Sequence, residues 1–288
     1  MCCSAQPARF ARTRILVHAT RHPQTKRDIH VLAYQNTPTN LAASGGNAMI
    51  LHIPSARPMD EENFVVADSA PRFMKDIAES VLPSPPVTRG GERRSSIQFG
   101  AKSAPIVFAY GDIYTVVLAQ SVEGIAEALE DVPPNRRPEI GQELLDFYGT
   151  EFDGWTLALC CFDSRDAKEA PPVTLWFESL FPDLLIAPGI DAHDGKKPNL
   201  TKPVAVDHEI FLSHPGLSRD AKKIRYSGWD SMSPALRSFL PDRAVGKAFG
   251  GRMENGDFVL EVGQQNRPSI SKVVRYRPSA YPAPAVAA

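Results

Sequence analysis

Three short stretches near the N-terminus decide the fold: TRILVHA at residues 13–19, IHVLAYQN at 29–36 and NAMILHI at 47–53. In each stretch, apolar residues recur at every second position, which is the period of a β-strand with alternate side chains on opposite faces. The segment between the first two stretches, residues 20–28, is rich in turn-forming residues. The pattern therefore predicts an antiparallel meander of three strands.

The even-numbered positions of these three predicted strands carry His18, His30 and His52. If the first hairpin closes through its turn, His18 lies opposite His30, and His52 comes beside His30 from the third strand. Three imidazoles on neighbouring strands resemble the ligands of a zinc ion that activates water, so the trio is a candidate site for a divalent metal such as zinc. A mixed polar and apolar outer face explains the same residues without a metal.

The rest of the chain alternates short strands and helices without regular βαβ units. Helical spacing of apolar residues predicts helices at 71–82, 122–132 and 138–152. A hairpin of two strands, 106–110 and 113–119, is predicted around the turn at Gly111-Asp112. Asn255-Gly256 is a strong signal for a second hairpin, between strands at 243–253 and 257–263. We therefore expect an α+β fold, mostly antiparallel sheet, with an N-terminal meander, C-terminal hairpins and a few peripheral helices.

A second polar group is expected where the predicted strands 184–193 and 204–213 meet. If they pair with His193 opposite Asp207, then Asp191 and Glu209 share their face of the sheet. Such a cluster binds a metal, or holds a histidine as a general base that a carboxylate orients. The alternative is a solvated hairpin edge with charges beside a turn.

The four cysteines form two adjacent pairs, Cys2-Cys3 and Cys160-Cys161. Removal of the initiator methionine leaves a free α-amine on Cys2. In N-terminal nucleophile hydrolases the first residue attacks an amide carbon and its own α-amine accepts the proton, so Cys2 is a candidate catalytic nucleophile. The alternative is an ordinary N-terminal arm that packs against the body of the protein.

Cys160 and Cys161 lie in the apolar run WTLALCCF, residues 155–162, which predicts a buried strand. Successive strand residues face opposite sides, so the two thiols are expected in the core on different faces. A four-cysteine zinc site is disfavoured because structural zinc ligands are separated by at least two residues.

Composition excludes several classes of protein. The 288 residues are 43% hydrophobic and 23% charged, with a net charge of -1, so no global field draws the chain to nucleic acid or to an anionic membrane. No apolar stretch approaches the ~20 residues of a membrane helix. Four cysteines are too few for a disulfide scaffold. We expect a cytoplasmic protein with reduced thiols.

The domain organisation expected from the sequence is one α+β domain over residues 1–277. A segment at 83–104 combines proline, glycine and serine with basic residues and is expected to be a mobile loop, and a disordered tail is expected at 278–288. A basic segment of this kind is also a candidate contact for an acidic partner.

Two classes of function remain open from the residues alone. The first is a hydrolase of amide or related bonds that uses Cys2 or the cluster of Asp191, His193 and Asp207. The second is a non-catalytic binding or assembly protein, with contacts through 83–104. The sequence identifies neither the partner nor the oligomeric state. It lacks the GxxxxGK[ST], GxGxxG and GxSxG motifs of nucleotide-binding proteins and serine hydrolases.

The N-terminal fifth of the chain resembles the opening of an uncharacterised bacterial family of domains of unknown function. The resemblance lies in a cysteine-containing start, a strand that ends in Tyr34-Gln35-Asn36, and the stretch AMILHIP at 48–54. The chain departs from the pattern at His52, where a proline is expected. The resemblance supports the meander and implies no activity.

Overall fold

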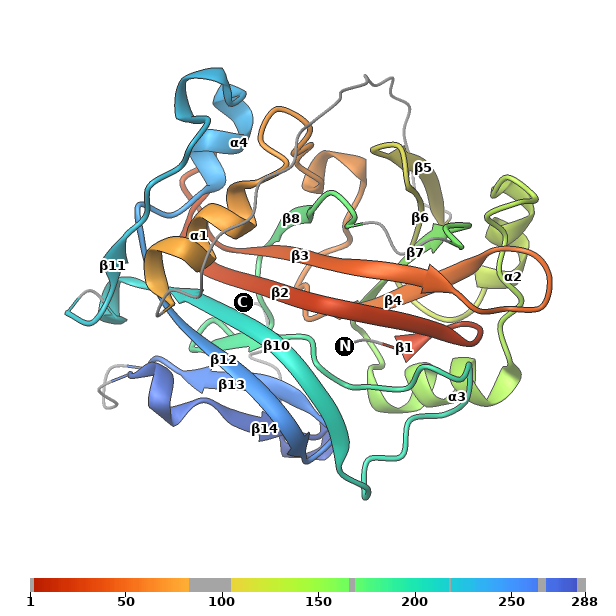
Figure 1. Ribbon diagram of the computed structural model, residues 1–288. Helices are drawn as coiled ribbons and strands as arrows, with labels where there is room; N and C mark the ends of the chain where they lie inside the picture. The colour runs from red at the N-terminus through yellow and green to blue at the C-terminus, as the bar shows by residue number, and fades with distance from the viewer. Residues whose placement is uncertain (1–2, 83–104, 166–168, 218, 264–267, 284–288) are drawn as a thin grey trace.

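The computed structural model describes residues 3–82, 105–165, 169–217, 219–263 and 268–283. Three sheets, mostly antiparallel, form the centre of the molecule, and a few short helices lie at its periphery (Figure 1). The α+β fold class predicted from the sequence is confirmed. The predicted loop at 83–104 lies outside the described residues.

The largest sheet has six strands in the order β11-β12-β10-β2-β3-β8. Its centre is the long antiparallel hairpin of β2 and β3, and the other edge of β2 pairs with β10 in parallel. The strands are β2 (Ala8–Arg21), β3 (Asp28–Asn40), β8 (Val173–Phe177), β10 (Val204–Ser213), β11 (Lys222–Lys223) and β12 (Arg243–Met253).

The second sheet has five strands in the order β1-β4-β7-β6-β5, and the third has three in the order β14-β13-β9. The five strands are β1 (Cys3–Ser4), β4 (Asn47–Ile53), β5 (Ile106–Tyr110), β6 (Tyr114–Ala119) and β7 (Thr156–Phe162). The three strands are β9 (Leu184–Ala187), β13 (Asp257–Glu261) and β14 (Val274–Tyr276).

One hydrophobic core lies between the three sheets. Val17 and Leu32 face it from the six-stranded sheet, Met49 and Cys160 from the five-stranded sheet, and Phe258 from the three-stranded sheet. These side chains are at most 2% exposed. Removing this apolar surface from water is the main favourable term that holds the sheets together.

The helices cover the outer faces of the two larger sheets. α1 (Phe73–Val81) and α4 (Pro234–Phe239) pack on the six-stranded sheet, whereas α2 (Ile125–Ala128) and α3 (Gln142–Glu151) pack on the five-stranded sheet (Figure 1). The helix predicted at 71–82 is confirmed. Within the range of the helix predicted at 122–132, the structure has only the short helix α2 and one 3-10 turn.

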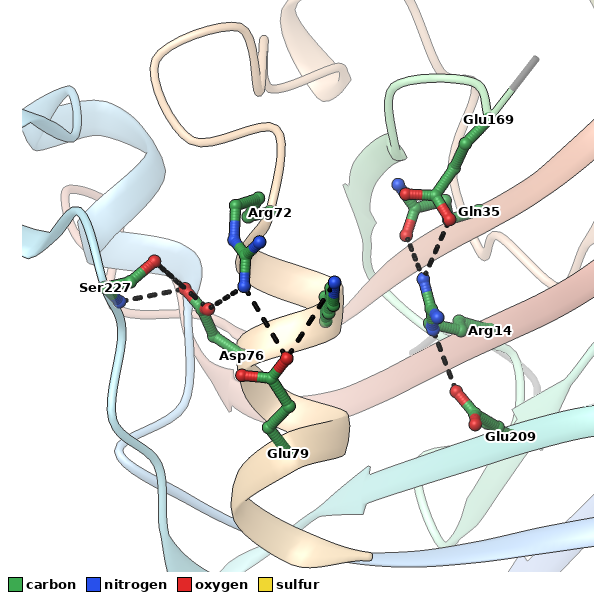
Figure 2. Close-up of polar contacts among 9 residues, drawn as sticks. Arg14, Gln35, Arg72, Asp76, Glu79, Glu169, Glu209 and Ser227 are labelled. Carbon is green, nitrogen blue, oxygen red and sulfur yellow. Dashed lines mark hydrogen bonds and ion pairs between the residues drawn. The ribbon is translucent and has the colours of Figure 1, made fainter. Parts of the chain in front are cut away.

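Polar contacts attach α1 to the segment that follows β11. The carboxylate of Asp76 accepts hydrogen bonds from the backbone N–H and the hydroxyl of Ser227, each at 2.9 Å (Figure 2). Arg72 lies 3.9 Å from the same carboxylate. Asp76 is buried, so these partners replace the water that a carboxylate otherwise requires.

The predicted three-stranded meander is only partly correct. β2 and β3 pair as expected, but β4 belongs to the five-stranded sheet, between β1 and β7. The register of the hairpin also differs, because Ile15 lies opposite Tyr34 and Leu16 opposite Ala33. Both faces of this hairpin are buried, so no polar face fixes the register in the sequence pattern.

The predicted hairpin around Asn255-Gly256 does not form. β12 pairs with β10, whereas β13 pairs with β9 and β14. The tight hairpin turn typical of Asn-Gly requires positive φ at both residues, and neither residue has it. Gly256 is needed for a close approach instead, since a Cβ there would lie 2.3 Å from the carbonyl oxygen of Tyr276.

Candidate functional site

A cavity lies beside the end of the β2–β3 hairpin. β10 ends at Ser213, which pairs with His18, whereas β2 continues to Arg21 without a partner on that edge. The cavity beside this overhang has a volume of about 1070 Å³. We call it the histidine cavity, because His18, His30 and His214 line it from three different segments.

All three histidines are held as neutral imidazoles at neutral pH. Burial lowers the pKa of His18 to about 4, although a hydrogen bond to the backbone of Ser213 acts in the opposite direction. Burial also lowers the pKa of His30 to about 4, against a hydrogen bond to the backbone of Pro182. For His214, burial lowers the pKa despite the nearby carboxylate of Asp183. An uncharged ring is the form that a desolvated site favours.

These rings leave hydrogen-bonding capacity at the cavity. Nδ1 of His18 is buried and has no hydrogen-bond partner among the described residues. Nδ1 of His214 accepts a hydrogen bond from the backbone N–H of Gly216 at 3.0 Å, so the neutral ring carries its proton on Nε2. The wall therefore offers the imidazole donor of His214, whereas Nδ1 of His18, though unsatisfied, has almost no exposed surface.

Part of the charge around the histidine cavity is neutralised by ion pairs. The four carboxylates that line it are Asp28, Glu178, Asp183 and Asp242. The four guanidinium groups that line it or bind these carboxylates are Arg21, Arg27, Arg57 and Arg243. A ligand that enters therefore meets neutral imidazoles and carboxylates, two of which, Asp28 and Glu178, already form ion pairs.

The predicted zinc trio does not assemble. His18 lies opposite Val31 and His30 opposite Ala19, so the expected register is wrong and the two rings leave the hairpin on opposite faces. His52 lies on β4, in another sheet. Within the described residues, no three His, Cys, Asp or Glu side chains are placed to hold a metal ion. His18 and His30 still reach the same cavity, because it lies at the end of the hairpin.

His52 is instead part of a fully buried polar cluster around Asp257. Its Nε2 lies 2.9 Å from both carboxylate oxygens of Asp257. The same carboxylate accepts hydrogen bonds from the backbone N–H of Gly189 at 2.8 Å and the hydroxyl of Tyr281 at 2.7 Å. Asp257 is 0% exposed, so no substrate reaches it and its role is structural.

This set of partners also controls the ionisation of Asp257. Burial by itself raises the pKa of the carboxyl group, but the attraction and hydrogen bond of His52, with those from Gly189 and Tyr281, lower it below its usual value. Tyr281 lies in the tail that was expected to be disordered from residue 278, and its ring packs on Trp155 and Phe181. The ordered chain thus extends beyond residue 277.

The predicted cluster of Asp191, His193 and Asp207 is divided. Nε2 of His193 lies 2.8 Å from a carboxylate oxygen of Asp191, although the pair is not aligned as a hydrogen bond. Asp207 lies on β10, where its carboxylate accepts a hydrogen bond from the backbone N–H of Arg12. The expected pairing of 184–193 with 204–213 is wrong, because β9 pairs with β13.

Glu209 was expected on the face of that cluster. Its carboxylate instead accepts a hydrogen bond from Nε of Arg14 at 2.8 Å, and the guanidinium of Arg14 also contacts Gln35 and Glu169 (Figure 2). All four side chains belong to this ion-pair network on the six-stranded sheet. Glu209 is therefore committed to Arg14.

Cys2 lies outside the described residues, and its neighbour Cys3 begins β1 at the edge of the five-stranded sheet. The segment after Cys3 lies against the loop that carries Asp191. The backbone N–H of Ser4 donates to the carbonyl of Ala192, and that of Ala8 donates to the carbonyl of His193, each at 2.9 Å. Residues 4–8 and the Asp191–His193 pair are thus neighbours.

The two middle cysteines are core residues of β7, as predicted. Cys160 faces the core between the sheets, and Cys161 faces the helices on the outer side of the five-stranded sheet. Both are 0% exposed. Burial raises the pKa of the Cys161 thiol to about 12, which keeps it protonated and unreactive.

Sequence reasoning missed the members of the histidine cavity that lie outside the hairpin. His214 follows the predicted strand 204–213 directly, and a polar residue at a strand end is the signal that points to it. Asp183 and Asp242 carry no comparable signal, because each lies in an irregular connection far along the chain. Only the packing of these connections brings the carboxylates to the hairpin.

Comparison with known proteins adds little. No family model matches the chain, and no curated protein matches it either. One matching solved structure is the crystal structure of baculovirus P35, with 11% sequence identity, a TM-score of 0.40, and coverage of 88% of this chain and 89% of that one. Such values are too low to transfer a function. The N-terminal resemblance to a bacterial family stays a prediction.

Among the described residues, no helix combines the length and the apolar character that a membrane crossing requires.

Proposed function

We propose that this protein is a binding protein and that its ligand is a small, uncharged polar molecule held in the histidine cavity. The observation that carries the proposal is the convergence of three neutral imidazoles, those of His18, His30 and His214, on one cavity.

The size and charge of the cavity support this class of ligand. Its volume of about 1070 Å³ matches the upper end of small-molecule sites, which span roughly 300–1,000 Å³. The four lining carboxylates disfavour anionic ligands, and two of them, Asp28 and Glu178, are already paired with guanidinium groups. Hydroxyl and amide groups suit the site, because they form hydrogen bonds to neutral imidazoles as donors and as acceptors.

The test is a binding screen with imidazole signals as the readout. Protein labelled with ¹⁵N at histidine is mixed with uncharged polyols, nucleosides and small amides, and ring-nitrogen chemical shifts are recorded. Binders should move the signals of His18 and His214 and leave that of His193 in place. A His18→Phe variant should lose binding at least tenfold, whereas the matched His193→Phe variant keeps it. Binding that is equal in both variants would contradict the proposal.

A second candidate is the hydrolase of amide or related bonds that uses Cys2. What supports it is the contact of residues 4–8 with the loop of Asp191 and His193, which places an imidazole and a carboxylate beside the N-terminal segment. In that function, Cys2 is the nucleophile, its α-amine accepts the thiol proton, and His193 assists the leaving group. A cytoplasmic location, with its reduced thiols, suits such a nucleophile.

Intact-mass spectrometry tests this second function directly, because a retained Met1 leaves no free amine on Cys2 and ends the hypothesis. If Met1 is absent, turnover of activated amide and ester substrates is compared between wild type, Cys2→Ala and His193→Ala. Cys3→Ala is the matched control, because that thiol is buried. The hydrolase function requires loss of turnover in Cys2→Ala and its retention in Cys3→Ala.

A further inference from the structure

A second hollow, of about 740 Å³, lies beside the turn of the same β2–β3 hairpin. Three rings form its wall. The indole of Trp176 and the ring of Phe239 are parallel within 6°, with centroids 6.3 Å apart. The imidazole of His22 packs against both, at 4.5 Å from Trp176 and 5.6 Å from Phe239. We call this hollow the aromatic pocket.

The wall is fixed before any ligand arrives. Nδ1 of His22 lies 3.3 Å from the backbone N–H of Gln24 and 3.1 Å from that of Thr25, and it accepts hydrogen bonds from both. The indole N–H of Trp176 donates to the carbonyl of Glu62 at 3.2 Å. Rings that are held by such bonds lose little conformational entropy when a ligand binds.

The polar groups of the aromatic pocket carry an unbalanced negative charge. Glu62 and Asp68 line it, and none of its described lining residues is a lysine or an arginine. Burial raises the pKa of Asp68, and the nearby carboxylate of Asp112 raises it further. Asp68 therefore lacks a compensating cation among these residues, in contrast to Asp28 and Glu178 at the histidine cavity, which form ion pairs.

We propose that the aromatic pocket binds the guanidinium group of an arginine side chain on a partner polypeptide. Aromatic faces attract cations, and the attraction strengthens as the site loses water. A guanidinium is planar, so it stacks flat on an aromatic ring while its edge forms two hydrogen bonds to a carboxylate such as that of Asp68. An ammonium is attracted to the same groups, but it is not planar and lacks the fork of donors that matches a carboxylate.

The dimensions of the pocket favour a polypeptide over a free cation. A volume of about 740 Å³ exceeds what one guanidinium fills, so room remains for the chain on either side of the arginine. Ser69, Ser233 and Ser238 also line the pocket and supply hydroxyls for backbone groups of that chain. Charge complementarity thus selects the arginine, and the serines suit the segment that carries it.

The experiment uses the full chain and three short peptides, acetyl-Gly-Arg-Gly-amide and its lysine and citrulline analogues. Binding is followed through the indole N–H signal of Trp176 in ¹⁵N NMR spectra, assigned with a Trp176→Phe variant. The arginine peptide should shift this signal in a saturable manner. The citrulline peptide, which keeps the shape of arginine and loses its charge, should bind at least tenfold more weakly. The affinity of the lysine peptide should lie between those of the arginine and citrulline peptides.

Two variants distinguish an effect of the Asp68 carboxylate from an effect of general surface charge. Asp68→Asn should weaken binding of the arginine peptide at least tenfold. Asp153→Asn, which changes an exposed carboxylate after α3, should leave this affinity unchanged. Unchanged chemical-shift dispersion confirms that each variant is folded. Equal affinity for the arginine and citrulline peptides, or for wild type and Asp68→Asn, overturns the proposal. So does equal affinity for arginine and lysine, because the site is then not built for a guanidinium.

Discussion

The cluster around Asp257 and the end of the β2–β3 hairpin both combine histidines with carboxylates, yet the first is closed around one carboxylate and the second lines a cavity. The Asp257 carboxylate has four hydrogen-bond donors, from His52, Gly189, Ile190 and Tyr281. At the hairpin end, a ring nitrogen of His18 has no partner among the described residues. Nδ1 of His52 is likewise buried without a partner among the described residues, so the two regions differ in that His18, unlike His52, lines the histidine cavity.

This contrast distinguishes structural from functional polar residues. A satisfied buried group stabilises the fold, and its removal leaves former partners unpaired. An unsatisfied group at a cavity destabilises the fold and is therefore a candidate for binding. Each prediction below tests whether the two regions respond to change in these opposite ways.

The largest effect is expected in the satisfied cluster. Asp257→Ala leaves His52, Tyr281 and the N–H of Gly189 without their acceptor in a buried site. We expect a loss of about 3–5 kcal/mol in the free energy of unfolding, measured by urea denaturation. Tyr281→Phe removes one donor and should cost about 1–2 kcal/mol. A loss below 1 kcal/mol for Asp257→Ala would remove the distinction between the regions.

Acid should destabilise the two regions over different pH ranges. His30 has a pKa of about 4 in the folded protein and about 6.5 when unfolded, so its neutral form stabilises the fold above pH 6.5. This stability, on the order of 3 kcal/mol, is lost as the pH falls from 6.5 to 4. Asp257 has a lowered pKa, so its contribution persists above pH 3.8 and is lost at lower pH.

Urea denaturation of wild type and His30→Gln between pH 7 and pH 3 measures this difference. The variant should lose less stability than wild type between pH 6.5 and pH 4, and the two should then decline in parallel. Identical pH profiles over the upper range would show that His30 is not held in its neutral form.

His18→Phe should change stability little, in contrast to Asp257→Ala. The change removes the unpartnered Nδ1, which is favourable, and the bond to the backbone of Ser213, which is unfavourable. We expect an unfolding free energy within about 1 kcal/mol of wild type. Thermal denaturation checks this value, and a loss of several kcal/mol would assign His18 to the structural class.

The smallest effect is expected at Asp68, in the aromatic pocket. Burial and Asp112 disfavour its charged form, so Asp68→Asn should raise the stability at pH 7 slightly, by less than about 0.5 kcal/mol because the group is partly exposed. The gain should vanish at acidic pH, where the wild-type carboxyl group is protonated. A decrease in melting temperature at pH 7 would indicate that Asp68 has a partner in the folded protein.

Local features of the fold were largely predictable. The period of the apolar residues located β2, β3, β4 and α1, and the apolar run around Cys160 located β7. Pairing was less predictable. The partner of β2 on its second edge is β10, and Arg14 and Glu209, which join these strands, are 195 residues apart. No short-range pattern carries that information.

The candidate site was predictable only in part, for the same reason. His18 and His30 were identified as a pair from their place on adjacent strands, and they do line one cavity. His214, Asp183 and Asp242 reach it from separate connections. The aromatic pocket was not predicted at all, since its rings come from the hairpin turn, β8 and α4.

The sequence by itself determined which segments are strands, which thiols are buried and that the sheets are mostly antiparallel, because these depend on the alternation of neighbouring side chains. Only the tertiary structure decided which strands pair, which histidine receives a carboxylate and which histidines line a cavity. Those outcomes depend on contacts between distant segments, whose free energy is set by packing and burial. The properties that separate Asp257 from the hairpin end therefore arise only when the three sheets enclose their common core.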